Sequence, residues 1–155
     1  MNAEPSAISD WVVDASVVAK WYLKDEEFVG QADRLLDRYL DGTTTLTTPH
    51  FTRYELANAV TRAARNGRVT TDEAGAALLD FSGLGLAQEA DNDGLLASAL
   101  RIATRFGVSF YDALYLALAE ELQAGLITAD VPLFSRVSAE MPFVSLLADV
   151  PLDLP

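Results

Sequence analysis

Short apolar strands alternate with amphipathic helices along this chain, and the alternation constrains its fold more than any other feature. The segment WVVDAS at 11–16 has the nearly continuous apolar character of a strand that is covered on both faces. The segments at 43–49 and 126–130 are also typical of strands. A weaker strand is expected within 84–90, and a last one within 142–147.

Helical spacing of apolar residues fills the intervals between these strands. Between 26 and 42 the apolar residues recur on one helical face, and Gly42 ends the pattern. Further helices are predicted at about 50–66, 70–81, 93–107 and 110–125, with a short helical turn at 131–137 and a helical segment at 17–23. Strands that alternate with helices in this way predict a three-layer α/β/α sandwich around a central, mostly parallel sheet.

Length and composition limit the class of protein. The chain has 155 residues, half of them apolar, and no repeat or linker divides it, which favours a single domain over 1–155. It has no cysteine, so disulfides and thiolate metal sites are excluded, and its one histidine, His50, excludes a His-rich zinc site. The first ten residues do not resemble a secretory signal and no apolar run could span a bilayer, so we expect a soluble cytoplasmic protein.

Four carboxylates occupy positions where acids are unusual. Asp14 and Asp130 follow predicted parallel strands, and ligands bind beyond the carboxyl ends of such strands. Glu55 and Asp112 lie on helices with few other charges beside them. Each acid also has an ordinary interpretation, because Asp14, its neighbour Ser16 or Asp130 could cap a helix, Asp112 could stabilise a first helical turn, and Glu55 could lie at an edge.

Four motifs in order, VVDASVV, PHFTRYELANAV, SFYDALYLALA and LITADVPLF, resemble the PIN-domain family, and most closely its VapC-type bacterial and archaeal toxins. The resemblance covers about 12–146. It implies an endoribonuclease that depends on Mg²⁺ or Mn²⁺ and leaves a 5′-phosphate and a 3′-hydroxyl. Motif by motif, it places the acidic quartet of the family at Asp14, Glu55, Asp112 and Asp130.

The resemblance also assigns supporting residues. Ser16 and Thr128 match positions that often support the site in the family, and Asn58 matches a common polar residue one turn after the glutamate. VapC-type toxins are usually homodimers, and each is inhibited by an antitoxin that often places a basic side chain near the acidic pocket. Trp21, Tyr22 and Phe28 could form an apolar groove for such a partner, although core packing is the alternative for at least one of them.

The chemistry of the quartet agrees with this assignment. Carboxylates that converge in one pocket raise each other's pKa unless a cation lies among them, and hard divalent ions prefer oxygen ligands. Such ions lower the pKa of a bound water and neutralise charge on a leaving oxygen. We expect Asp14 and Asp112 to make the tightest metal contacts, Asp130 to complete the set directly or through water, and Glu55 to position the attacking water. The number of ions stays open.

A net charge of −12 argues against a general nucleic-acid coat protein. Between Gly42 and Thr70, however, the only acid is Glu55, and four arginines accompany it. Arg62 lies on the helical face of Glu55 and Arg65 follows one turn later, so we expect these two residues to contact RNA phosphates. An ordinary solvated helix face is the alternative interpretation.

Other families fit the same residues less well. A haloacid-dehalogenase-type phosphatase needs a second aspartate where this chain has Ser16, and a receiver domain needs a late lysine, whereas only Lys20 and Lys24 are present. A Ser-His-Asp hydrolase would have to use His50 and lacks the G-x-S-x-G turn. A degenerate PIN domain that only binds a protein, a housekeeping RNA-processing nuclease, and the identity of the RNA target stay open.

Overall fold

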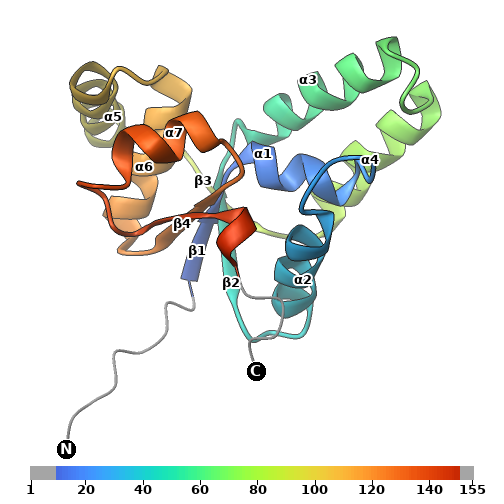
Figure 1. The fold of residues 1–155 in the computed structure, drawn as a ribbon, viewed down its shortest axis with the longest axis horizontal. Coiled ribbons are helices and arrows are strands. Elements are labelled where there is room, and N and C mark those ends of the chain that lie inside the picture. Colours follow the sequence, from blue (N-terminus) through green and yellow to red (C-terminus); the bar gives the residue numbers. More distant parts are fainter. Residues whose placement is uncertain (1–9, 151–155) are drawn as a thin grey trace, which may run out of the picture.

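The computed structural model describes residues 10–150 and has a five-stranded parallel sheet at its centre (Figure 1). The strands are hydrogen-bonded in the order β3-β2-β1-β4-β5, and their bounds are Asp10–Val13 for β1, Thr45–Pro49 for β2, Ala87–Glu89 for β3, Gly125–Thr128 for β4 and Val144–Leu146 for β5. The predicted strands are thus confirmed as one parallel sheet. The first nine residues, on which the expectation of no secretory signal rests, lie outside the described residues.

Helices cover both faces of this sheet, which confirms the predicted three-layer α/β/α arrangement (Figure 1). On one face lie α1 (Ala15–Val18) with its 3-10 extension η1 (Ala19–Trp21), α2 (Val29–Leu40), α3 (Thr52–Arg65) and α4 (Thr71–Gly83). On the other face lie α5 (Asp93–Phe106), α6 (Phe110–Leu122) and α7 (Val131–Val137). A second 3-10 turn, η2 (Leu147–Asp149), follows β5. Within 10–150, no helix is long and apolar enough to cross a membrane.

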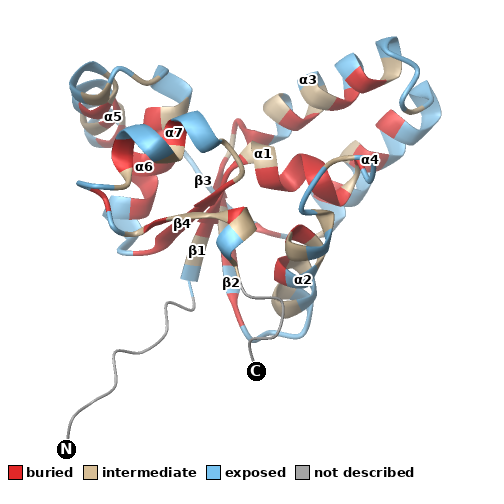
Figure 2. Cartoon of the chain, in the orientation of Figure 1, coloured by how far each residue is buried: buried red, intermediate tan, exposed pale blue. Residues whose placement is uncertain are grey.

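Two apolar cores lie on opposite faces of the sheet, because successive side chains of a strand point to opposite sides. Val12 and Leu126 pack against α5, α6 and α7, whereas Val13 and Ile127 pack against the α1 to α4 side. All four side chains are almost completely inaccessible to solvent, and in Figure 2 the central strands are mostly buried, although β1 begins at the exposed Asp10. This double coverage explains why the central strands have nearly continuous apolar sequences.

The boundary between α6 and β4 differs from the predicted helix over 110–125. The helix ends at Leu122, Gln123 turns the chain with a left-handed φ of 52°, and Gly125 is the first residue of β4. A close approach that only the sheet creates accounts for the glycine at this place in β4, because Trp11 of β1 lies directly beside Gly125. A Cβ atom on Gly125 would stand 2.4 Å from Cζ3 of Trp11, so a larger residue would clash there.

Two other helices also begin at residues other than those predicted. The helical segment after β1 begins at Ala15 rather than Val17, because Asp14 and not Ser16 caps it. The helix expected from about 50 begins at Thr52, after Pro49 has ended β2. Thr70 and Glu73 form a capping box at the start of α4, as expected from two threonines that precede acids.

Candidate active site

A cavity of about 400 Å³ lies where β1 and β4 end and where α1, α3 and α6 approach them. All four acids singled out from the sequence line it, although they come from four separate segments of the chain. The supporting residues Ser16 and Asn58 line it as well. The remaining lining residues are Ala15, Ala19, Lys20, Glu26, Ala59, Arg62 and Ala129.

Asp14 is the most buried of the four acids, with 6% of its surface exposed. It is the residue after β1, and its Oδ1 accepts a hydrogen bond of 3.3 Å from the backbone N–H of Ser16, which caps α1. Its Oδ2 accepts a hydrogen bond of 2.7 Å from the hydroxyl of Thr128. Both interpretations of Asp14 therefore hold, because the same carboxylate caps a helix and faces the cavity.

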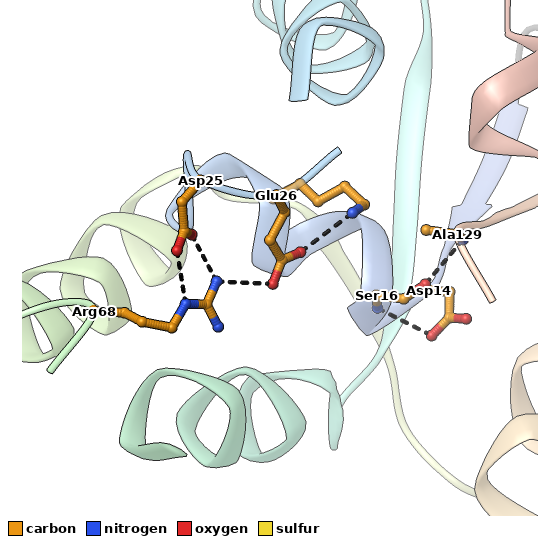
Figure 3. Close-up of polar contacts among 7 residues, drawn as sticks. Asp14, Ser16, Asp25, Glu26, Arg68 and Ala129 are labelled. Atoms are coloured by element: carbon orange, nitrogen blue, oxygen red, sulfur yellow. Dashed lines mark hydrogen bonds and ion pairs between the residues drawn. The ribbon is translucent and has the colours of Figure 1, made fainter. Parts of the chain in front are cut away.

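Ser16 and Thr128 join the end of β1 to the end of β4. The Ser16 hydroxyl accepts a hydrogen bond of 3.0 Å from the backbone N–H of Ala129 (Figure 3). Thr128 Oγ1 accepts one of 3.0 Å from the backbone N–H of Asp130. Asp130 in turn caps α7 by accepting a hydrogen bond of 3.0 Å from the backbone N–H of Leu133. These bonds hold the backbone segments of Asp14 and Asp130 side by side at the carboxyl ends of β1 and β4.

A buried tyrosine that sequence reasoning missed holds Glu55. Tyr115 of α6 is completely buried and donates a hydrogen bond of 2.7 Å from its hydroxyl to Oε1 of Glu55. The hydroxyl of Thr52 lies 2.9 Å from the same tyrosine oxygen. A sequence signal did exist, because Tyr115 lies three residues after Asp112 on an otherwise apolar helix and therefore shares its face. Nothing in the motif itself shows that this hydroxyl reaches α3.

Burial and neighbouring negative charges raise the pKa values of three cavity acids. Burial raises the pKa of Asp14 to about 6 against the opposing hydrogen bond from Thr128, and the charge of Asp112 adds to the rise. The pKa of Glu55 is raised mainly by burial, while the Tyr115 hydrogen bond lowers it and the charges of Asp14 and Asp112 raise it. Burial also raises the pKa of Asp112, with a contribution from Asp130. A cation in the cavity would relieve this repulsion.

The donor set suits a hard divalent ion, because it consists of carboxylate oxygens and contains no thiolate or imidazole. His50 lies elsewhere, with its Nδ1 3.4 Å from a carboxylate oxygen of Asp91. In the arrangement that the structure describes for residues 10–150, no three Asp, Glu or His side chains form a group that could hold a metal ion.

The basic side chains predicted to bind RNA differ in their relation to the cavity. Arg62 lines it, whereas Arg65 is exposed one turn further along α3 and is not among the lining residues. Arg68, the last arginine of the basic stretch, pairs with Asp25 and Glu26, so its charge is offset locally. The structure adds Lys20 and Glu26 to the cavity, neither of which the sequence patterns had indicated.

The aromatic residues considered for a partner groove occupy different environments. Trp21 belongs to the core, with 4% of its surface exposed and its indole N–H donated to the backbone oxygen of Ala32. Tyr22 donates its hydroxyl to Asp80, and Phe28 is 43% exposed. The core alternative is therefore confirmed for Trp21.

The fold and the acidic cavity together define an α/β protein with a carboxylate-rich site at the end of a parallel sheet. Residues 11–140 match the PIN domain family model. The chain is 34% identical over 132 residues to ribonuclease VapC3 of Pyrobaculum aerophilum, covering 83% of this chain and 95% of that protein. It is 33% identical over 131 residues to ribonuclease VapC9 of Mycobacterium tuberculosis, covering 84% and 94%. The chain belongs to the PIN-domain family.

Solved structures have the same fold. The crystal structure of PAE2754 from Pyrobaculum aerophilum superposes with a TM-score of 0.64 at 28% identity, over 83% of this chain and 80% of that one. VapC20 of Mycobacterium tuberculosis, described as a sarcin-ricin loop cleaving toxin, superposes with a TM-score of 0.60 at 18% identity, over 94% and 99%. At that identity the second match supports the fold alone.

Proposed function

We propose that this chain is an endoribonuclease that depends on Mg²⁺ or Mn²⁺ and serves as the toxin of a toxin–antitoxin pair. The observation that carries the proposal is the convergence of Asp14, Glu55, Asp112 and Asp130 on one cavity in a member of the PIN-domain family. The relatives named as VapC ribonucleases support the same activity. As an RNA-cleaving toxin it would act in the cytoplasm.

In this proposal Asp14, Asp112 and Asp130 hold the metal, and the bound ion supplies an acidified water and charge neutralisation at the scissile phosphate. Thr128 and Ser16 keep Asp14 oriented, and Thr128 also binds the backbone of Asp130. Glu55 positions the attacking water, with Asn58 beside it on α3. Arg62 and Arg65 attract the RNA backbone toward the cavity.

Metal dependence is the first expected result. Purified protein, freed of any antitoxin, should cleave RNA with Mg²⁺ or Mn²⁺, stop when a chelator is added, and recover when Mn²⁺ is restored in excess, because the proposed mechanism needs an ion to acidify the water and neutralise charge on the phosphate. Gel analysis of a labelled RNA measures this. Calorimetric titration of Mn²⁺ into the wild type and into Asp112→Asn tests whether the chain is instead a degenerate PIN domain that only binds a protein. In that case the two proteins should give the same heat of Mn²⁺ binding. Cleavage that persists in chelator rules out the metal mechanism.

The antitoxin and a homodimer are further parts of the proposal. Both are implied by the resemblance to VapC-type toxins, and a cavity rich in carboxylates suits an inhibitory segment that carries a basic side chain. Phe28 is the exposed aromatic residue among the three considered for the groove, so it is the one that remains available for such a partner.

Growth arrest is the expected result in cells. Expression of this chain alone should halt growth of its host or a related one, and co-expression of the neighbouring small gene should restore growth, because an antitoxin would cover the acidic cavity. Asp112→Asn, expressed to the same level, serves as the matched control and should leave growth normal. Colony counts with and without induction measure the effect. Normal growth despite abundant, cleavage-active protein would instead favour a housekeeping RNA-processing nuclease.

A further inference from the structure

Lys20 stands out among the residues of the cavity that the proposed mechanism does not use. It belongs to η1, four residues after Ser16, so it follows Ser16 by one helical turn on the same face of the α1–η1 segment. Its side chain is 11% exposed, and it lines the same cavity as Asp14 and Glu55. A lysine is rarely so buried without a partner or a function.

Two acids and an arginine fix the position of this ammonium group. Lys20 Nζ donates a hydrogen bond of 3.2 Å to Oε2 of Glu26, whose other oxygen accepts one of 3.2 Å from Arg68. Arg68 also binds Asp25 through two further bonds of 2.8 and 2.6 Å (Figure 3). Because Glu26 is itself held in this way, the long side chain of Lys20 is ordered before any ligand arrives.

The ion pair with Glu26 does not use the full capacity of the ammonium group. A lysine has three N–H donors on its side chain, and within residues 10–150 Glu26 accepts the one hydrogen bond that the Lys20 ammonium group donates. A partly buried ion pair is also weak evidence for a role in stability, because desolvation of the charges offsets their attraction. The remaining donors are therefore free for a ligand in the cavity that Lys20 lines.

The charges of the cavity indicate what that ligand is. Five carboxylates line it, and Lys20 and Arg62 are the cations among the lining residues. A polyanion that enters the cavity therefore needs a positive contact away from the acidic quartet. Lys20 offers such a contact on a preordered side chain, as the compact point charge that suits phosphate oxygens.

We propose that Lys20 is a phosphate-binding residue of this cavity, which receives a backbone phosphate of the RNA strand next to the one that is cleaved. The inference rests on the proposed ribonuclease function and adds a substrate contact to it. Glu26 and Arg68 act through Lys20, as positioning residues that keep its ammonium group facing the cavity.

The test is RNA affinity against salt concentration in the Asp14→Asn background, with low Mg²⁺ held constant. Lys20→Met should weaken binding about 10-fold and reduce the salt slope by about 0.7, the value for one contact to single-stranded RNA. Lys24→Met is the matched control, because it removes the same charge from an exposed lysine that pairs with Asp33 outside the cavity. Lys20→Arg should keep the wild-type slope.

Each outcome decides the proposal. If the Asp14→Asn protein itself binds RNA, equal effects of Lys20→Met and Lys24→Met would overturn the proposal. Lys20 would then serve only in a structural ion pair. If the Asp14→Asn protein binds no RNA, the proposed ribonuclease function itself would be overturned. Thermal unfolding of each variant checks the fold, and Lys20→Gln replaces Lys20→Met if the latter does not fold.

Discussion

Asp14→Asn is expected to lower RNA cleavage by at least about 100-fold and, at the same time, to stabilise the metal-free protein at pH 8. The loss of activity follows because an amide is a poorer metal ligand than a carboxylate, and even indirect partners of a metal site contribute about 10- to 100-fold. The gain in stability follows from the electrostatics of the buried carboxylate. A residue kept for structure alone would not give this combination.

The sign of the stability change follows from proton binding. Burial raises the pKa of Asp14 from 3.8 to about 6, so between these values the folded protein binds more protons than the unfolded chain. The free energy of unfolding therefore falls as pH rises from about 4 to about 7 and stays low above that range. The total fall in the free energy of unfolding is about 3 kcal/mol, since one pKa unit corresponds to about 1.36 kcal/mol. The amide of the Asp14→Asn variant accepts one hydrogen bond fewer than the carboxylate, which costs about 1 kcal/mol. The variant should therefore gain about 2 kcal/mol in the free energy of unfolding at pH 8.

Urea unfolding of the chelator-treated wild type and Asp14→Asn at several pH values measures this effect. Asp33→Asn is the matched control, because its exposed carboxylate binds Lys24 outside the cavity. It should leave both cleavage and the pH dependence of stability nearly unchanged. A variant Asp14→Asn that is less stable than wild type at pH 8 would contradict the unfavourable burial of this charge.

Tyr115→Phe is expected to lower kcat by about 10- to 100-fold with little change in KM for RNA. The Tyr115 hydroxyl donates to Glu55 and contacts Thr52, so it orients the carboxylate proposed to position the water. Burial raises the pKa of Tyr115 far above its usual range, so the hydroxyl stays a donor at every working pH. Hydrogen bonds to charged groups contribute about 1.5 to 3 kcal/mol, which corresponds to the expected loss.

The pH profile distinguishes this positioning role from a purely structural one. The Tyr115 bond lowers the pKa of Glu55, so its removal should raise that pKa and move the acid limb of the kcat profile to higher pH. Tyr22→Phe is the matched control, because Tyr22 donates the same kind of bond, 2.8 Å long, to Asp80 away from the cavity. An unchanged profile in Tyr115→Phe, or an equal fall of kcat in both variants, would remove Tyr115 from the mechanism.

Local sequence patterns predicted the elements of this fold well, because each depends on neighbouring residues. The double coverage of the sheet is visible in the unbroken apolar character of WVV and LIT, and Gly107 ends α5 in the left-handed conformation that glycine favours. The predicted end of α6 was wrong because Gln123 takes the left-handed conformation that ends the helix, whereas Gly125 lies in β4 beside Trp11, more than a hundred positions away in the chain. No helical periodicity contains that information.

The sequence by itself determined the class of the fold and singled out four acids that line one cavity, because strand ends are local properties and each motif can be matched within its own short segment. Only the tertiary structure decided which other groups accompany them. Tyr115 reaches Glu55 across 60 positions, and Thr128 reaches Asp14 across 114. Arg68 joins the cavity region through Glu26, although it lies 42 positions away in the chain. Parallel strands bring distant segments to one edge, so the partners of a buried charge depend on packing and cannot be read from spacing along the sequence.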